Sequence, residues 1–151
     1  MSISIQRATP QDAPTLLALI RALAAYEREP DAVELSEAEL RRQLSAAEPP
    51  FQCFLAKDEA GAPLGFALFF FSYSTWRGRP GVYLEDLFVL PEARRMGVGR
   101  ALLQELIALG RTRGCARLEW SVLDWNEPAI NFYRALQATP MEGWTTWRLN
   151  L

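Results

Sequence analysis

The chain has 151 residues with a formal net charge of −2; half are hydrophobic and 23% are charged. This composition indicates one soluble globular domain over residues 1–151. The start of the chain lacks a signal-peptide pattern, and no apolar run approaches the ~20 residues of a membrane span, so we expect a cytoplasmic protein without a membrane partner. Without a long basic run, no nucleic-acid partner is expected.

The chain contains no histidine, which excludes Ser-His-Asp and Cys-His catalysis and most zinc sites. Two cysteines, Cys53 and Cys115, cannot form a metal cage, and their apolar surroundings predict inert buried thiols. No metal is therefore expected, and general acid–base catalysis is left to Glu, Asp, Tyr, Lys or water.

Two capping patterns mark helix starts. Thr9 is followed by Pro10 and Asp12, and Ser36 by Glu39. The predicted elements, in chain order, are a strand at 3–7, helices at about 10–26 and 36–44, strands at 51–57, 64–73 and 82–90, a helix at about 99–113, a strand at 116–123, a short helix at 127–136 and a last strand at 144–151.

This order predicts an α/β (α+β) fold with a mixed, mostly antiparallel central sheet and helices on both faces. Residues 74–81 are expected to form a loop, and only the step from Val82 to Leu123 has the form of a parallel crossover.

The turn 94–99, Arg-Arg-Met-Gly-Val-Gly, lies between a buried strand and a helix. Glycines let a ligand approach the backbone, and free N–H groups with the helix dipole attract phosphate. The turn is not a Walker loop, and Leu102 occupies the position of the third small residue in a dinucleotide fingerprint. The alternative is a glycine-rich turn with solvated arginines.

Arg-x-x-Gly-x-Gly after Leu-Glu-Asp-Leu-Phe-Val resembles the acetyl-CoA motif of the GNAT N-acetyltransferases. The resemblance extends to their spermidine/spermine (diamine) branch and its thialysine acetyltransferase relatives. Three segments carry the resemblance: 23–27, 65–99 and 124–133, the last reading Asp-Trp-Asn-Glu-Pro-Ala-Ile-Asn-Phe-Tyr. The resemblance implies the GNAT fold and acetyl-CoA as cosubstrate.

The resemblance also implies how acetyl-CoA is held: a strand backbone contacts the pantetheine arm and the turn amides wrap the pyrophosphate. The implied cofactor-binding residues are Leu87, Phe88, Val89, Arg94, Arg95, Met96, Gly97, Val98, Gly99, Arg100, Asn126, Glu127, Pro128, Ala129 and Tyr133. Asn126 also fits a helix N-cap. The family often has Arg-Gly-x-Gly-x-Gly, and Arg95 stands where its first glycine would be, either adding a contact or crowding the loop.

Two residues are the catalytic candidates that the resemblance implies. Tyr133 has the chemistry to donate a proton to the departing CoA thiolate, although a tyrosine in this helix fits a core position equally well. Glu85 would accept the proton of the amine, directly or through water; the alternative is a structural ion pair. Glu85 and Asp86 are strand neighbours that normally face opposite ways, and a family bulge near this position loosens that rule.

A cationic acceptor predicts acidic and aromatic contacts. The residues assigned to acceptor binding are Tyr26, Glu27, Glu85, Asp86, Glu142 and Trp144. Glu27 also fits a solvated helix end, and Trp144 a core or dimer-interface position. The chain is shorter than the family pattern between Tyr133 and Glu142, which leaves the alignment of that segment open.

We therefore predict an N-acetyltransferase that moves acetyl from acetyl-CoA to a primary amine of a polyamine, diamine or thialysine-like amino acid. The amine would attack directly in a ternary complex, with the backbone near Leu87 polarising the thioester carbonyl. A homodimer is expected from the family. The alternatives are a peptide-amine or antibiotic acceptor, a non-catalytic acyl-CoA sensor and, more distantly, a Rossmann-like nucleotide-binding domain.

Overall fold

The computed structural model describes residues 2–151, which divide into two compact units, residues 2–120 and Ser121–Leu151. The first unit contains β1 (Ser4–Arg7), the short 3-10 helix η1 (Pro10–Asp12), α1 (Ala13–Tyr26), α2 (Glu37–Leu44), β2 (Gln52–Lys57), β3 (Pro63–Ser74), β4 (Arg79–Val89), η2 (Pro91–Ala93), α3 (Val98–Thr112) and β5 (Leu118–Trp120). The second unit contains α4 (Glu127–Ala135). No helix in residues 2–151 is long and apolar enough to cross a membrane.

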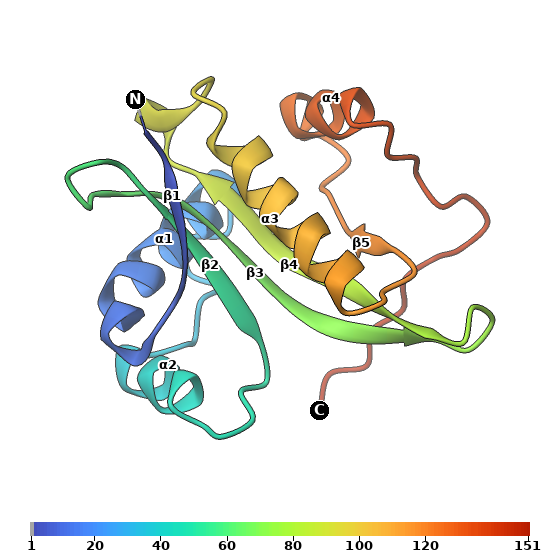
Figure 1. The fold of residues 1–151 in the computed structure, drawn as a ribbon, viewed down its shortest axis with the longest axis horizontal. Helices are drawn as coiled ribbons and strands as arrows, with labels where there is room; N and C mark the ends of the chain where they lie inside the picture. The colour runs from blue at the N-terminus through green and yellow to red at the C-terminus, as the bar shows by residue number, and fades with distance from the viewer. Residues whose placement is uncertain (1) are drawn as a thin grey trace. The chain divides into compact units, whose positions relative to one another are not determined.

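The five strands of the first unit form one sheet in the order β1-β2-β3-β4-β5 (Figure 1). The first three pairings are antiparallel, and β4 pairs with β5 in parallel, with Val82 opposite Leu118. The predicted mixed, mostly antiparallel sheet with one parallel step is confirmed. Because α3 connects β4 to β5, the chain leaves the sheet at the end of β4 and returns beside it.

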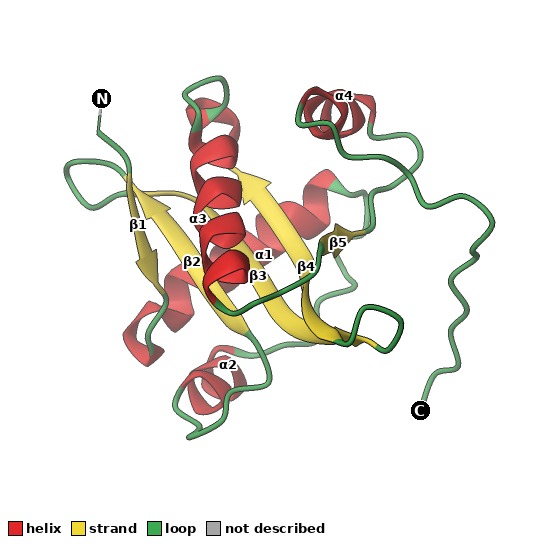
Figure 2. Cartoon of the chain, turned by 45° about the vertical axis from the view of Figure 1, so that its right-hand side comes forward, coloured by secondary structure: helices red, strands yellow, loops and turns green. Residues whose placement is uncertain are grey.

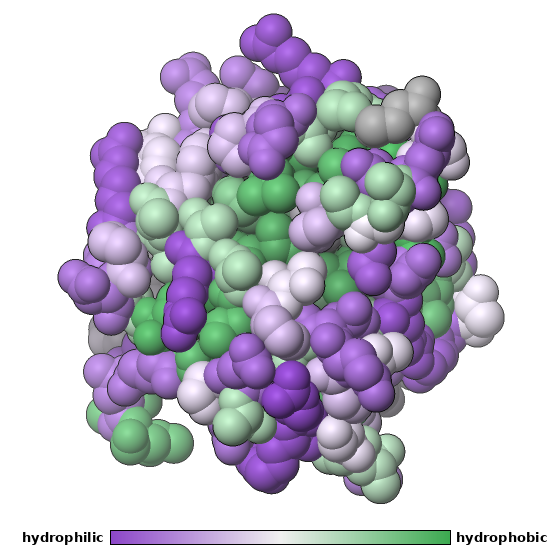
Figure 3. Space-filling model, turned by 90° about the vertical axis from the view of Figure 1, so that its left-hand side faces the viewer, coloured by the Kyte–Doolittle hydropathy of each residue, from purple (hydrophilic) through white to green (hydrophobic). Residues whose placement is uncertain are grey.

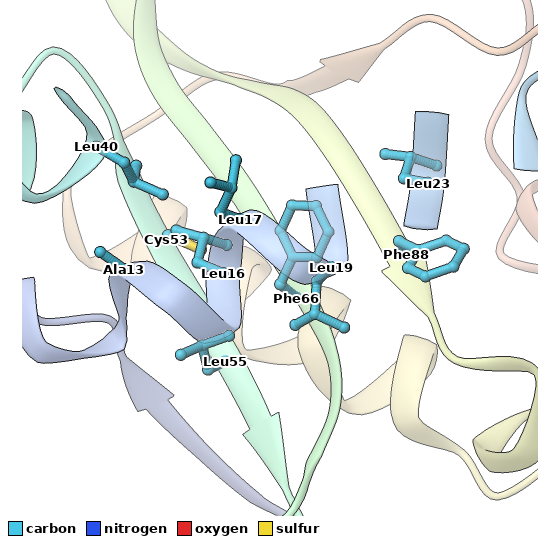
Figure 4. Packing of buried hydrophobic residues seen from close by; sticks show 10 residues of the cluster. All are labelled: Ala13, Leu16, Leu17, Leu19, Leu23, Leu40, Cys53, Leu55, Phe66 and Phe88. Atoms are coloured by element: carbon cyan, nitrogen blue, oxygen red, sulfur yellow. The ribbon is translucent and has the colours of Figure 1, made fainter. Parts of the chain in front are cut away.

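Helices cover both faces of this sheet, as predicted. Figure 2 shows α3 on one side of the strands and α1 on the other. On the α1 side, alternate strand residues such as Cys53, Leu55 and Phe66 enter one buried cluster with Leu16 of α1 and Leu40 of α2 (Figure 4). Phe88 of β4 lies beside Leu23 in that cluster, which anchors the end of β4 beneath the last turns of α1.

The Ser36 pattern predicted the start of α2, whereas the Thr9 pattern marks the start of η1, and α1 begins three residues later at Ala13. Asp12 accepts a hydrogen bond from the Thr9 amide at 2.8 Å, and Ser36 Oγ accepts one from the Glu39 amide at 3.1 Å. The Glu39 carboxylate does not complete a reciprocal box. It instead accepts hydrogen bonds from Arg42 and Gln43 one turn further on, and these contacts lower the pKa of Glu39 to about 2.

Two predicted features of the sheet are wrong. Residues 74–81 do not form a loop, because β3 and β4 continue to a pairing of Ser74 with Arg79 around a short turn. Residues 144–151 form no strand, and Trp147 and Leu149 are 90% and 85% exposed. A segment of alternating apolar residues forms a strand only when a neighbouring strand pairs with it. The sequence alone does not show whether such a neighbouring strand exists.

The surface outside the core is mostly hydrophilic on the face shown in Figure 3, where hydrophilic side chains surround a more hydrophobic centre. Cys53 is 1% exposed, as predicted, and burial raises the pKa of its thiol, so it stays protonated. Cys115 is only half-buried, because it follows Gly114 in the turn after α3.

Candidate active site

A β-bulge in β4 places the acidic pair. Asp86 pairs with Leu68 of β3, whereas Leu84 pairs with Phe69, so Glu85 lies between two consecutive pairs and has no partner of its own. Because Leu68 and Phe69 face opposite sides of the sheet, Asp86 and Leu84 do as well. The bulge implied by the resemblance is confirmed, and it turns Asp86 toward the α1 side.

Asp86 is a half-buried carboxyl group surrounded by negative charge. Burial first, and then the charges of Glu85 and Glu27, raise the pKa of Asp86 to about 7. Burial also raises the pKa of Glu27, which directly follows α1. Within residues 2–151 none of these three carboxylates forms an ion pair with a basic side chain, so the structural ion pair considered for Glu85 is wrong. Such a group of carboxylates is electrostatically unfavourable until a positive charge compensates it.

The turn before α3 presents its backbone to an anion. Arg95 and Gly97 have left-handed backbone angles, with φ of +67° and +82°. Arg94 N–H donates to Pro91 and Ala101 N–H to Gly97, but no hydrogen bond is formed by the amides of residues 95–100 in the described chain. Consecutive free amides at the start of a fifteen-residue helix suit a pyrophosphate group.

The backbone at Arg95 bears on the first glycine of the motif that the sequence resembles. A left-handed backbone conformation favours glycine. Arg95 adopts this conformation with a side chain present, which costs free energy of folding. Its side chain is exposed and does not close the turn, and Arg100 is also exposed. The turn therefore has the chemistry to bind a phosphate group.

Arg94 is held more firmly than the other arginines of the turn. Its Nε donates to the carbonyl of Val89 at 3.1 Å. Its guanidinium carbon lies 4.9 Å from the ring centroid of Tyr26 and 5.8 Å from that of Phe88. The two rings contact each other in a tilted arrangement with centroids 6.4 Å apart. The end of α1 and the turn before α3 are thus joined by a cation stacked on two aromatic rings.

The remaining predicted residues lie in the second unit. Asn126 is 7% exposed and its Oδ1 accepts a long hydrogen bond, 3.4 Å, from the Ala129 amide, so it caps α4 as expected. Pro128 occupies the first turn, and Tyr133 follows Ala129 by one helical turn. Tyr133 is half-buried, with its ring 5.5 Å from that of Phe132.

Glu142 and Trp144 lie outside any helix or strand, in the exposed segment after α4. Trp144 is 74% exposed, and Gly143 between them has a φ of +87°. Glu142 and Trp144 lie near each other only because they are two residues apart in the chain. That they bind the acceptor stays a prediction.

Two features of the first unit escaped the sequence interpretation. Phe70 and Tyr83 are paired across β3 and β4 with ring centroids 5.2 Å apart. They lie on the same sheet face as Asp86, because Phe70 is two residues from Leu68. The sequence could have indicated this pair, because Tyr83 lies only two positions before Glu85 in the same predicted strand. The stacking of Arg94 on Tyr26 had no signal, because it joins distant segments.

The comparisons with known proteins agree with this geometry. The model of the acetyltransferase (GNAT) family matches residues 16–137. This chain belongs to the GNAT acetyltransferase family. The acetyltransferase is 38% identical to thialysine N-epsilon-acetyltransferase of Bos taurus, over 97% of this chain and 91% of the relative. It is 35% identical to spermidine/spermine N(1)-acetyltransferase-like protein 1 of Homo sapiens, over 97% of this chain and 22% of that protein.

The fold comparison gives the same answer. A solved integron cassette protein from Vibrio cholerae superimposes with a TM-score of 0.82 at 26% identity, covering 99% of this acetyltransferase and 93% of that chain. The predicted family, fold class and acetyltransferase activity are therefore confirmed. Members of this family use acetyl-CoA as cosubstrate.

Proposed function

We propose that this acetyltransferase moves the acetyl group of acetyl-CoA to a primary amine of a small cationic acceptor. The acceptor is a polyamine, a diamine or a thialysine-like amino acid. The observation that carries the proposal is the cluster of Glu27, Glu85 and Asp86, whose mutual repulsion no basic side chain of residues 2–151 relieves. A bound ammonium group would relieve it. The names of the relatives, which are N-acetyltransferases of thialysine and ornithine, support the same acceptor class.

The residues divide the work of binding between two ends. The free amides of residues 95–100 hold the pyrophosphate of acetyl-CoA, which supplies the acetyl group as an activated thioester. Asp86 and Glu27 hold the acceptor's ammonium groups. The Phe70–Tyr83 pair, on the same face as Asp86, offers an aromatic surface for the acceptor's methylene groups.

The reaction moves three protons: the acceptor nitrogen loses two and the sulfur gains one. Glu85, which is exposed beside Asp86, accepts a proton from the acceptor's ammonium group, directly or through water. The amine nitrogen then forms its bond to the acyl carbon while the carbon–sulfur bond breaks, and the electron pair leaves with sulfur. Tyr133 donates a proton to that sulfur and regains one from water, to which the amide nitrogen releases its second proton. The backbone at Leu87 polarises the acyl oxygen during the transfer. No metal takes part in the proposed reaction.

The first test measures CoA release with acetyl-CoA and putrescine, spermidine, spermine, lysine and thialysine. Tyr133→Phe is assayed beside the native chain, with Tyr73→Phe as a control at an exposed tyrosine of β3. We expect turnover of at least one amine and a loss of at least tenfold in kcat for Tyr133→Phe alone. Acetyl-CoA binding without turnover of any amine would overturn the acceptor class and favour a peptide or antibiotic acceptor, or a sensor.

The second test concerns the acidic cluster. Asp86→Asn should raise KM for a polyamine by about tenfold or more, because it removes one charge that holds the cation. Glu105→Gln, on the exposed side of α3, is the matched control and should leave KM unchanged. Equal effects of the two substitutions would show that overall charge, and not the cluster, attracts the acceptor.

We also propose that the acetyltransferase is a cytoplasmic homodimer. Trp144 and Trp147 are 74% and 90% exposed, and tryptophan is enriched where proteins associate. Light scattering after size exclusion should give twice the mass of the chain, 17.1 kDa, and Trp147→Ser should lower it toward that of one chain.

A further inference from the structure

Arg94 differs from its neighbours in having a fixed guanidinium group. Arginine side chains lose about 2 kcal/mol of rotamer entropy when they are ordered. For Arg94, the hydrogen bond to Val89 and the stacking on Tyr26 have already ordered the side chain. All three arginines are exposed, but Arg95 and Arg100 have no such contact in the described chain.

The partners of Arg94 leave its charge available. A carboxylate partner would neutralise the guanidinium and compete with an incoming phosphate. An aromatic face and one carbonyl oxygen orient the group without neutralising it, and its remaining N–H donors stay free for an anion. The contacts of Arg94 therefore hold its guanidinium group in place without neutralising its charge.

The support behind Arg94 is rigid. Tyr26 is the last residue of α1, and its ring contacts Phe88, which is 5% exposed within the buried cluster. The same cluster contains Leu23, one turn before Tyr26. The orientation of the Tyr26 ring is therefore fixed by the hydrophobic core, and through this ring the core fixes Arg94.

We infer that Tyr26 is a positioning residue for the cosubstrate: its ring holds Arg94 in the orientation that binds the phosphate groups of acetyl-CoA. The inference rests on the proposed function for the identity of the anion. It assigns Tyr26 a task on the cosubstrate side, in addition to the acceptor contact predicted from the sequence.

The test measures CoA affinity by calorimetry without any amine, so the identity of the acceptor does not enter. Tyr26→Phe keeps the ring and should bind CoA within about twofold of the native chain. Tyr26→Leu keeps an apolar side chain against Phe88 but removes the ring, and should weaken CoA binding about 3- to 10-fold. Tyr26→Met replaces it if Tyr26→Leu does not fold, as judged by thermal unfolding without ligand.

A double-mutant cycle separates positioning from a general structural effect. In an Arg94→Gln background, Tyr26→Leu should cause no further loss of CoA affinity, because it acts through Arg94. The same loss in both backgrounds, or no loss in either, would overturn the inference. If the native chain does not bind CoA at all, the proposed function fails instead.

Discussion

Gly65 is the position where the structure tolerates a side chain least. It lies in β3 opposite Val89, and a Cβ atom built on it would be 2.4 Å from the carbonyl oxygen of Phe88 and 3.1 Å from Cα of Val89. Carbon–oxygen contacts between strands are normally about 3.3 Å or longer. Gly65→Ala must therefore move two backbones apart by about 0.9 Å, since no flexible side chain can yield.

The cost can be worked from these distances. Overpacking of this kind costs about 3 kcal/mol, at the upper end of the usual range because backbone atoms are involved. The lower entropy of the unfolded alanine chain returns up to about 1 kcal/mol. The free energy of unfolding should fall by about 2 kcal/mol, which corresponds to a decrease in Tm of roughly 4–8 °C for a chain of this size.

Urea unfolding measures this change, with Gly110→Ala as the matched control. The Cβ of that variant would lie 3.3 Å from the Val82 Cγ2 methyl group, which can shift, and alanine favours the helix. Its stability should equal or exceed that of the native chain. A Gly65→Ala variant within about 0.5 kcal/mol of the native chain would refute the reasoning. The variant should also bind CoA more weakly, because the displaced backbone is predicted to contact pantetheine.

Three further outcomes are expected. The pKa of Asp86 is about 4 in the unfolded chain and is raised to about 7 in the folded chain. The folded chain therefore holds this proton more tightly, which stabilises it below pH 4, and this stabilisation is lost as pH rises from about 4 to 7. Asp86→Asn should therefore gain about 2 kcal/mol over the native chain between pH 5 and pH 8 in chemical unfolding; a constant difference would contradict the buried carboxyl. Arg95→Gly should raise stability by about 0.5–1 kcal/mol while making CoA binding less sensitive to salt, measured by thermal unfolding and titration calorimetry; a lower Tm would argue against the left-handed turn. Asn126→Ala should cost about 1 kcal/mol by loss of the α4 cap, measured as a shift in the urea midpoint, whereas no shift would mean that the 3.4 Å contact contributes nothing.

Local signals predicted the elements of the first unit well. The caps at Thr9 and Ser36, and the boundary from Pro91 to Gly97, depend on residues close in sequence. The elements η1, α2 and α3 begin within a residue of the predicted positions, and α1 begins three residues after the predicted start. The predicted strand at 144–151 is wrong because a strand also needs a second strand to pair with, and the apolar pattern of this segment says nothing about that second strand.

The site was predictable to the extent that its residues are contiguous. The phosphate turn lies within one segment, so the sequence showed its glycines and arginines together. The stacking of Arg94 on Tyr26 joins residues far apart in the chain, and the raised pKa of Asp86 depends on Glu27 as well as on its neighbour. No local pattern contains either relation.

The bulge at Glu85 makes the pairing of the sheet independent of which side chain stands at position 85. Leu84 and Asp86 pair with adjacent residues of β3, so the ladder on each side would be continuous even without the residue between them. A side chain at position 85 consequently contributes nothing to sheet pairing or to the buried cluster. The identity of the residue at position 85 is therefore constrained by its chemistry toward the acceptor and not by the pairing of the sheet.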